Sequence, residues 1–205
     1  MTFVFDFGGV LFDWHPPRLL QRELPHRATD IGSTNRLVAD FFQGYGGDWG
    51  DFDRGHIEAS ELVVRIAART GLAEREVQAV LDGVPHELQP VAATVDLLRR
   101  LRDAGHRLFF LSNMPTQYAD HLEREHEFVH WFEDGVFSGR VGEVKPDAAI
   151  YALAAARYGV SPAELVFIDD MPLNVKAARE AGWNALRFVD AAQCEAELRQ
   201  NGWLV

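Results

Sequence analysis

The chain opens with an apolar run that ends in one acidic residue and two glycines. Residues 3–5 lack the polar alternation of a half-exposed strand, so they predict a strand buried on both faces, as in a parallel sheet. Asp6 follows this run, and the Gly8-Gly9 pair indicates a turn where the backbone approaches a ligand. Asp6 would therefore lie at the carboxyl end of a strand, where open α/β sheets bind their ligands.

From Pro90 onward, apolar strands alternate with helical patterns. The pattern predicts helices at 91–104, 119–125, 147–158, a stretch that ends at Ala181 and the C-terminal stretch, and strands at 108–111, 136–137, 165–168 and 185–188. Ser161 to Glu164 has the form of a capping box that opens a turn of helix. Strands that alternate with helices predict an α/β fold with a parallel sheet and right-handed crossovers.

The stretch between the first strand and Pro90 has helical patterns and no convincing buried strand. Pro16-Pro17 suits the start of a helix, and residues 61–70 form an amphipathic pattern with Ser60 as the expected cap. A further short helix is expected to end at Gly83. Residues 44–55, rich in glycine and aromatic side chains, predict a mobile loop.

Composition narrows the class of protein. The 205 residues, 47% apolar and 25% charged, suit one globular domain or a core domain with an insertion. A net charge of -11 argues against nucleic acid or an anionic membrane as a partner. The single Cys194 excludes an intramolecular disulfide and a cysteine metal cluster. With no apolar run near 18 residues and no signal segment, we expect a soluble, cytoplasmic monomer or homodimer.

Polar residues follow three of the predicted strands. Asp6, the Ser112-Asn113 pair and the Asp169-Asp170 pair each come directly after or at the end of an apolar run. Singly, each is typical of a turn or a helix cap, and Lys145 alone is typical of a surface lysine. Because the carboxyl ends of parallel strands meet at one edge of a sheet, together they predict a common crevice.

Carboxylates brought together in this way repel one another unless a cation lies among them. Mg²⁺ suits such a site, because it binds a few carboxylates, waters and a substrate phosphate. Asp6 would then stay ionised and attack phosphorus as a nucleophile. Lys145 would bind the phosphate, and the Ser112 hydroxyl with nearby amides would hold its oxygens. These residues predict a small phosphorylated metabolite as the substrate.

The same residues carry a family resemblance. Four segments resemble, in order and over nearly the whole chain, the four motifs of the haloacid dehalogenase superfamily: Asp6-Phe7-Gly8-Gly9-Val10, Leu111-Ser112-Asn113, Lys145-Pro146-Asp147, and Asp169-Asp170 with Asn174. The resemblance implies a Rossmann-like, three-layer core with a parallel sheet, Mg²⁺ as the cofactor and an aspartyl-phosphate intermediate.

The resemblance also implies a role for each matching residue. Asp6 would be the nucleophile, and Gly8 would offer its backbone carbonyl to the metal. The phosphate would be bound by Ser112, Asn113 and Lys145. Asp169 and Asp170 would both serve the metal, and which of them binds it directly stays open. Asn174 would be a supporting residue or an ordinary polar residue of a helix.

The spacing of the motifs locates an insertion. The stretch from Asp6 to Ser112 is far longer than a crossover helix needs, whereas little spare length separates the second and third motifs. We therefore expect a core of residues 1–14 and 89–205 and a small all-helical cap of residues 15–88. This arrangement resembles the first cap type of the superfamily, which closes over a small substrate.

Four residues near or within the expected cap are candidates for lining the substrate pocket. They are Trp14, His15, Tyr45 and Trp49. Ordinary packing or turn formation is the alternative for each of them, and His15 directly precedes the Pro16-Pro17 pair.

One residue departs from the family pattern. Superfamily phosphatases carry a second Asp two residues after the nucleophile, and this chain has Gly8 there. Three explanations stay open. The first is a sugar phosphatase that resembles the α-D-glucose-1-phosphate phosphatase branch, in which water, a cap residue or Asp13 supplies the proton. The others are a metal-independent 2-haloacid dehalogenase, which the Asp169-Asp170 pair disfavours, and a catalytically silent protein that binds a phosphate ligand. We predict the phosphatase, with sugar phosphates as the favoured substrates.

Overall fold

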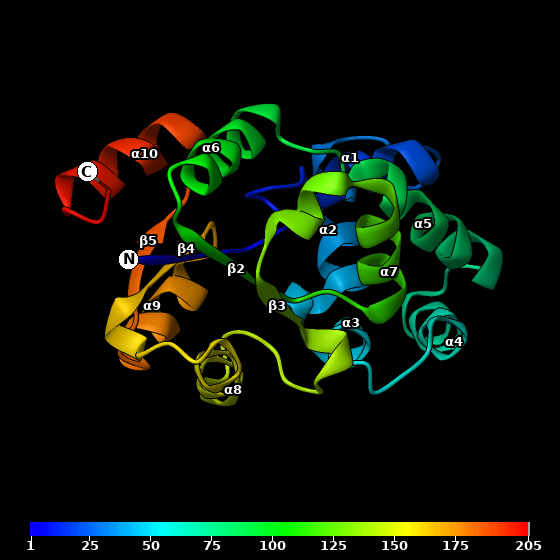
Figure 1. Ribbon diagram of the computed structural model, residues 1–205. Coiled ribbons are helices and arrows are strands. Elements are labelled where there is room, and N and C mark those ends of the chain that lie inside the picture. Colours follow the sequence, from blue (N-terminus) through cyan, green and yellow to red (C-terminus); the bar gives the residue numbers. More distant parts are fainter. Residues whose placement is uncertain (205) are drawn as a thin grey trace.

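A single parallel sheet organises the molecule (Figure 1). The computed structural model describes residues 1–204. The strand order is β3-β2-β1-β4-β5, and each neighbouring pair is parallel. The strands are β1 (Thr2–Phe5), β2 (Arg107–Ser112), β3 (Asp134–Phe137), β4 (Leu165–Asp169) and β5 (Asn184–Arg187). The α/β fold with a parallel sheet is confirmed, and β1 is its central strand.

Helices cover both faces of this sheet (Figure 1). On one face, α6 (Ala92–Asp103) and α10 (Ala191–Gln200) pack against Phe3 and Phe5. On the other, α8 (Ala148–Tyr158) and α9 (Pro172–Glu180) pack against Val4. Apolar side chains on both sides explain why β1 shows no polar alternation, and the three-layer core is confirmed.

A group of helices is inserted in the sequence between β1 and α6 and lies beside α7 (Thr116–Glu125) (Figure 1). It consists of α1 (Pro16–Glu23), α2 (Ile31–Phe42), α3 (Gly47–Asp53), α4 (Ala59–Thr70) and α5 (Glu74–Glu87). The helical insertion after the first strand is therefore confirmed. Its boundaries at residues 15 and 88 stay a prediction, because one hydrophobic cluster runs through the insertion and the sheet.

Short 3-10 helices complete the chain: η1 (Gln43–Tyr45), η2 (Glu127–Trp131), η3 (Ser138–Arg140) and η4 (Pro162–Glu164). The other predicted elements are present with ends shifted by a few residues. Among the helices of residues 1–204, none combines the length and the apolar character that crossing a bilayer requires.

The expectation of a mobile loop at residues 44–55 is wrong. Residues 47–53 form α3, in which Trp49, Phe52 and Asp53 share one buried face. Glycines disfavour an isolated helix, and burial of the two aromatic side chains offsets that cost. The insertion is therefore helical through most of the stretch that the glycines had marked as irregular.

The expected end of a helix at Gly83 is also wrong. Helix α5 continues through Gly83 and Pro85 to Glu87. A Cβ at Gly83 would lie 2.6 Å from a carboxylate oxygen of Glu23 on α1. This glycine therefore permits close packing of α1 against α5 instead of terminating a helix.

Two expected helix caps are absent from the described residues. Helix α4 begins at Ala59, so Ser60 lies inside it, and Glu58 occupies the cap position. No side-chain bond caps η4, which the backbone closes through a hydrogen bond of 2.9 Å from Glu164 N to Ser161 O. In neither place does a hydroxyl side chain cap the start of the element.

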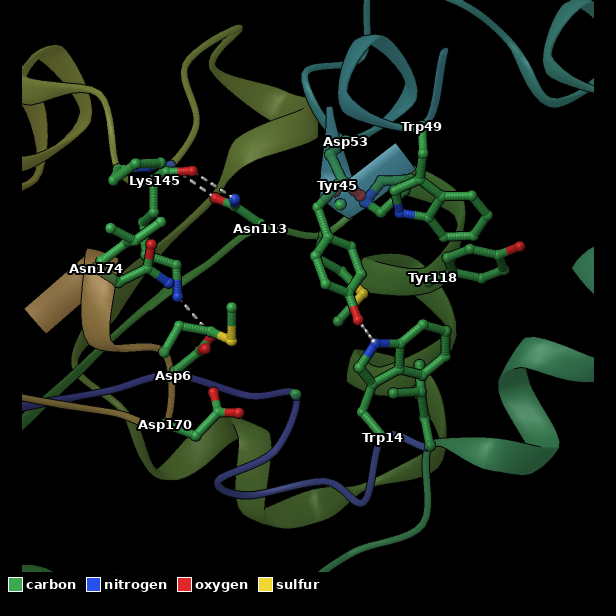
Figure 2. Close-up of a pocket in the computed structure, with 18 of the residues that line it drawn as sticks. Asp6, Trp14, Tyr45, Trp49, Asp53, Asn113, Tyr118, Lys145, Asp170 and Asn174 are labelled. Carbon is green, nitrogen blue, oxygen red and sulfur yellow. Dashed lines mark hydrogen bonds and ion pairs between the residues drawn. The ribbon is translucent and has the colours of Figure 1, made fainter. Parts of the chain in front are cut away.

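Three strands deliver polar residues to one edge of the sheet, beside the helical insertion. Asp6 follows β1, while Ser112 and Asp169 are the last residues of β2 and β4. Figure 2 shows Asp6, Asp170 and Lys145 on one side of a cavity at this edge, with Tyr45 of the insertion and Trp14, which precedes the insertion, opposite them. The predicted crevice is therefore present.

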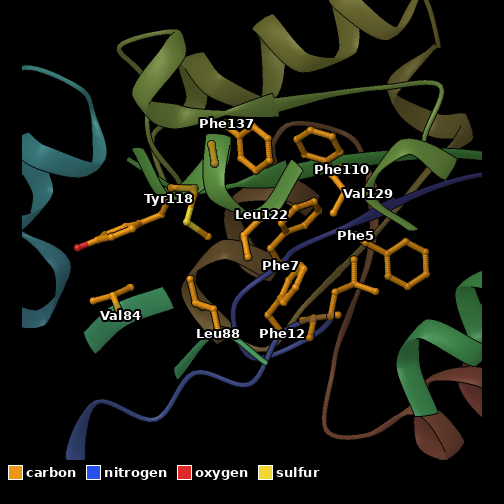
Figure 3. Close-up of a cluster of buried hydrophobic side chains, with 14 of the residues drawn as sticks. Phe5, Phe7, Phe12, Val84, Leu88, Phe110, Tyr118, Leu122, Val129 and Phe137 are labelled. Carbon is orange, nitrogen blue, oxygen red and sulfur yellow. The ribbon is translucent and has the colours of Figure 1, made fainter. Parts of the chain in front are cut away.

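An aromatic cluster lies beneath the turn that follows Asp6 (Figure 3). Phe7 is fully buried, with its ring centroid 4.8 Å from Phe110, 5.2 Å from Phe137 and 5.4 Å from Phe12. Such contacts leave the turn little freedom to move, because cores are packed at crystal-like density. The cluster therefore fixes the backbone that carries Asp6.

We expect Phe7→Ala to lower the free energy of unfolding by about 3–5 kcal/mol, the range for deletion of a buried aromatic side chain. Urea denaturation followed by circular dichroism measures this change. Val64→Ala on α4, whose side chain is exposed, serves as the control and should stay within about 0.5 kcal/mol of wild type. A Phe7→Ala midpoint equal to that of wild type would contradict the assignment of this core.

Candidate active site

A cavity of about 260 Å³ lies between the carboxyl edge of the sheet and the helical insertion (Figure 2). Its polar wall comes mainly from the core and includes Asp6, Gly8, Asn113, Lys145, Asp170 and Asn174. Its largely apolar wall includes Trp14, Tyr45, Trp49, Val84, Leu88, Met114, Pro115, Tyr118, Met171 and Leu173. The cavity thus joins a charged end to an apolar chamber.

Three carboxylates meet at the charged end. Oxygens of Asp6, Asp169 and Asp170 all lie within 4.8 Å of one another. Asp6 and Asp169 are buried, and Asp170 is partly buried. Like charges this close are unfavourable without positive charge among them. A hard divalent cation fits such a set, because all of its donors are oxygens.

The Lys145 side chain supplies positive charge from the protein. Its Nζ lies 2.8 Å from Asp6 Oδ1 and 2.7 Å from Asp169 Oδ2, and only 1% of the side chain is exposed. Burial alone would lower the pKa of Lys145, but the charges of Asp169 and Asp6 outweigh it and raise that pKa. Burial raises the pKa of Asp6, and the Lys145 ammonium opposes that shift. Lys145 is therefore a member of the site and not a surface lysine.

Asn113 holds the backbone of Lys145. Its Nδ2 donates to Lys145 O at 2.9 Å, and its Oδ1 accepts from Lys145 N at 2.8 Å. Both ends of the side-chain amide are therefore occupied. The Asn113 side chain therefore positions Lys145, and phosphate binding at Asn113 stays a prediction.

Asp169 and Asp170 lie in different surroundings. Asp169 is fully buried and accepts from Met171 N at 2.8 Å, from Asn174 Nδ2 at 3.1 and 3.0 Å, and from Lys145. Asp170 lies on the cavity wall, and burial with the charge of Asp169 raises its pKa. Asp170 is thus the member of the pair that faces the cavity. Asn174, expected as a supporting residue, orients the other member.

The glycine pair after the first strand forms the expected turn, and approach of its backbone to a ligand stays a prediction. Gly9 has φ +76°, and a Cβ there would lie 2.7 Å from the carboxylate of Asp170. Only glycine accepts this backbone conformation together with so close a neighbour. Gly8 lies on the cavity wall next to Asp6. The turn therefore lets the segments after β1 and β4 approach each other.

Ser112 ends β2 with a buried hydroxyl that lacks a partner. Its Oγ has no hydrogen-bond partner among residues 1–204, and the residue is 1% exposed. Buried polar groups without partners are rare and unfavourable, so this hydroxyl is an unfilled hydrogen-bonding position close to the acidic cluster. A phosphate oxygen is a ligand that would fill it.

The expected pocket residues divide into two groups. Trp14, Tyr45 and Trp49 line the cavity, and Trp14 Nε1 donates to Tyr45 Oη at 2.9 Å. His15 does not line it, because its Nδ1 accepts from Arg18 N at 3.1 Å and caps α1. The substrate-pocket expectation for His15 is therefore wrong, and the alternative of a residue that starts a helix holds.

Sequence reasoning missed Asp53, the last residue of α3. It is 4% exposed and lies on the cavity wall. Burial raises the pKa of Asp53 to about 8, while Lys145 and Arg54 oppose the shift. Its signal in the sequence was the helical spacing of Trp49, Phe52 and Asp53, which places an acid on the face of two buried aromatic residues.

Comparison with known protein families agrees with this geometry. The family model of the haloacid dehalogenase-like hydrolases matches residues 1–182. The chain belongs to this family. The resemblance of its four motifs is therefore confirmed, and the protein is a hydrolase.

Relatives of this haloacid dehalogenase-like hydrolase include phosphatases and dehalogenases. It is 31% identical over 198 residues to the sesquiterpene phosphatase astK of Aspergillus oryzae, which covers 96% of this chain and 94% of that protein. It is 27% identical over 188 residues to the (S)-2-haloacid dehalogenase of Pseudomonas putida. That match covers 88% of this chain and 80% of that protein.

The fold also matches a solved structure. A haloacid dehalogenase family enzyme of Bacteroides thetaiotaomicron, in complex with magnesium and inorganic phosphate, superposes with a TM-score of 0.69 and 22% identity. The match covers 91% of this chain and 92% of that one. At this identity the likeness shows the shared fold.

The raised pKa of Asp53 predicts a pH-dependent stability. Between the ordinary pKa of 3.8 and about 8, the folded protein keeps a proton on Asp53 that the unfolded chain has lost. Stability from this group is therefore present at low pH and is lost as the pH rises through that window. Asp53→Asn should gain stability relative to wild type from about pH 4 to about pH 8, with no further gain above it.

Urea denaturation of both proteins across this pH range measures the difference. Asp51→Asn, which changes a half-buried carboxylate on the same helix, is the control for net charge. A constant difference between Asp53→Asn and wild type at all pH values would contradict the raised pKa.

Proposed function

We propose that this protein is a Mg²⁺-dependent phosphomonoesterase that works through an aspartyl-phosphate on Asp6. The observation that carries the proposal is the buried Lys145 ammonium between Asp6 and Asp169, with Asp170 on the adjoining cavity wall. This arrangement gives an anionic substrate local positive charge within an acidic protein.

Each residue of the charged end has a role in this proposal. The Asp6 carboxylate attacks phosphorus while the ester oxygen leaves, and water then attacks the same phosphorus and restores Asp6. Lys145 Nζ and the Ser112 hydroxyl bind phosphate oxygens. Asp169 orients Lys145 and, with Asn174, keeps the cluster ordered.

Asp6, Asp170 and the backbone carbonyl of Gly8 would hold the cation. When bound, Mg²⁺ would offset the charge of the carboxylates and of the phosphate, and would favour the ionised form of Asp6. Asp170 is the direct carboxylate ligand of the Asp169-Asp170 pair in this proposal, because it faces the cavity while Asp169 is occupied by four hydrogen bonds.

A metal-independent 2-haloacid dehalogenase is the second candidate, favoured by Gly8 and by the dehalogenase among the relatives. The three-carboxylate cluster favours the phosphatase, because a dehalogenase reaction needs no cation. A catalytically silent phosphate-binding protein would keep the same cluster. Turnover separates the silent protein from both enzymes, and metal dependence separates the two enzymes.

The apolar chamber of the cavity indicates which class of phosphate ester fits the site. The preference for sugar phosphates rested on the first motif alone. A sugar requires free hydrogen-bonding groups around its hydroxyls, and two donors of this chamber, the Trp14 indole and the Tyr118 hydroxyl, already have partners. Trp14 Nε1 donates to Tyr45, and Tyr118 Oη donates to Leu81 O at 3.1 Å.

We infer that the substrate is the monophosphate of an apolar alcohol. Aromatic and aliphatic walls favour such an alcohol, since each buried Å² of apolar surface contributes about 25 cal/mol. The printed activity of the relative from Aspergillus oryzae, a sesquiterpene phosphatase, supports this class. The chemical class extends to any alcohol whose apolar part fits beside the charged end.

Phosphate release from p-nitrophenyl phosphate tests the reaction. Wild type with Mg²⁺ should turn over, chelation should abolish turnover, and added Mg²⁺ should restore it. Asp6→Asn should lose on the order of 10⁴-fold or more, as expected for removal of a nucleophile. Asp120→Asn, which changes an exposed carboxylate on α7, is the control and should retain activity. Full activity of Asp6→Asn would contradict the nucleophile, and halide release from 2-haloacids without metal would support the second candidate.

Competition between substrates tests the inferred class. The kcat/KM for a prenyl monophosphate should exceed that for glucose phosphates by about 10-fold or more, because one or two buried methylenes already contribute that much. Trp49→Ala should narrow the ratio, because it removes apolar surface from the wall of the cavity. A ratio that favours glucose phosphates in wild type would restore the sugar class.

A further inference from the structure

The core position from which superfamily phosphatases protonate the leaving alcohol carries no acid in this chain. Gly8 stands two residues after the nucleophile, where superfamily phosphatases carry an Asp. Asp13, a candidate for the missing group, is not on the cavity wall, and its Oδ2 lies 2.6 Å from Arg18 Nη2. Among the described residues of the wall, Asp53 is the one carboxyl group outside the metal-binding cluster.

Asp53 comes from the insertion, yet the core fixes its position. Its backbone carbonyl accepts from Ser138 Oγ at 2.5 Å, and Ser138 Oγ in turn accepts from Met114 N at 2.8 Å. The next residue, Arg54, pairs with Asp147 at 2.7 Å. These contacts join the end of α3 to the segments that follow Asn113 and Lys145.

The Asp53 carboxyl group is buried but free to meet a ligand. Figure 2 shows it with Tyr45 and Trp49, on the side of the cavity away from Asp6 and Asp170. The hydrogen bond from Ser138 engages the backbone carbonyl of Asp53 and not its carboxyl group. Burial is the largest influence on its pKa and raises it, Lys145 and Arg54 lower it, and Asp6 raises it further. Its protonated form is therefore present at neutral pH.

We propose that Asp53 is the general acid and base of the phosphomonoesterase reaction, supplied by the insertion in place of the missing core Asp. This inference rests on the proposed function. As the Asp6–phosphorus bond forms and the phosphorus–ester oxygen bond breaks, the Asp53 carboxyl gives its proton to the leaving oxygen, and the alcohol departs. Asp53, now a carboxylate, takes a proton from water as the water oxygen attacks phosphorus. Inorganic phosphate leaves, Asp6 is a carboxylate again, and Asp53 is protonated again.

This placement links proton transfer to the position of the insertion. The acid reaches the reacting ester only when α3 packs on the core through Ser138 and Asp147. An ester bound while the insertion is displaced would lack its proton donor, so turnover would require the closed arrangement described here.

Two leaving groups separate proton donation from other roles of Asp53. An alkyl alcohol needs a proton to leave, whereas p-nitrophenolate does not. Asp53→Asn should lower turnover of an alkyl phosphate by about 10²–10⁴-fold, the usual contribution of general acid catalysis. With p-nitrophenyl phosphate it should release a fast burst of nitrophenol stoichiometric with enzyme, followed by slow turnover. Intact-protein mass spectrometry during that slow phase should find the variant carrying a phosphoryl group.

Asp13→Asn and Asp51→Asn are matched controls, because both carboxylates lie off the cavity wall. Both variants should keep wild-type turnover of both esters. If Asp53→Asn matches wild type, or loses the same factor on both esters with no burst, Asp53 is not the acid. If wild type itself hydrolyses neither ester with Mg²⁺, the proposed function fails and this inference fails with it.

If Asp53→Asn does not fold, a measurement on the wild-type protein alone still tests the proposal. Across a series of phosphate esters, rates should depend only weakly on the acidity of the leaving alcohol, because the proton is transferred as the bond breaks. A steep dependence in wild type would overturn the proposal whatever the variant does.

Discussion

The ion pairs of one buried lysine are the interaction on which the site depends. Parallel pairing of β1 with β4 brings Asp6 and Asp169 to the same edge of the sheet, where their charges would repel. Lys145 bonds to both, and Asn113 fixes the Lys145 backbone from the end of β2. Loss of one partner from such a buried network costs roughly 3–5 kcal/mol, because it leaves an uncompensated charge. The same ammonium is available to a phosphate, so the feature that allows these carboxylates to be buried also makes the site suitable for an anion.

The apolar half of the cavity has its origin in the packing of the whole molecule. Phe7 and its aromatic neighbours continue into the insertion through residues such as Phe12 and Tyr118, and Tyr118 bonds to α5. Helices α3 and α5 therefore pack on the core as part of one hydrophobic cluster, and they share the apolar wall of the chamber with core segments around α7 and α9. A charged end at the edge of the sheet beside this apolar wall is what supports the proposal of a phosphate ester of an apolar alcohol.

Much of the site followed from the sequence because strand polarity is a strong constraint. An acidic or hydroxyl residue at the end of a buried parallel strand has to lie at one edge, which placed Asp6, Ser112 and Asp169 correctly. The local sequence pattern gave wrong predictions where tertiary packing determines the structure. The glycines around α3 indicate a loop, and for that reason the sequence did not identify Asp53 as a residue of the cavity wall. The separate surroundings of Asp169 and Asp170, and the use of the Asn113 amide by Lys145, depend on contacts between segments distant in sequence.

The measurement that tests the central claim most directly is chemical trapping of the phosphorylated protein. Wild type, incubated with Mg²⁺ and a phosphate ester and then quenched with borohydride, should carry homoserine in place of Asp6, since borohydride reduces an acyl phosphate to the alcohol. Peptide mapping by mass spectrometry locates the modified residue. Reduction at Asp6, dependent on the ester, is the result that this account predicts. Steady turnover with an unmodified Asp6, or with the modification at another residue, would contradict it.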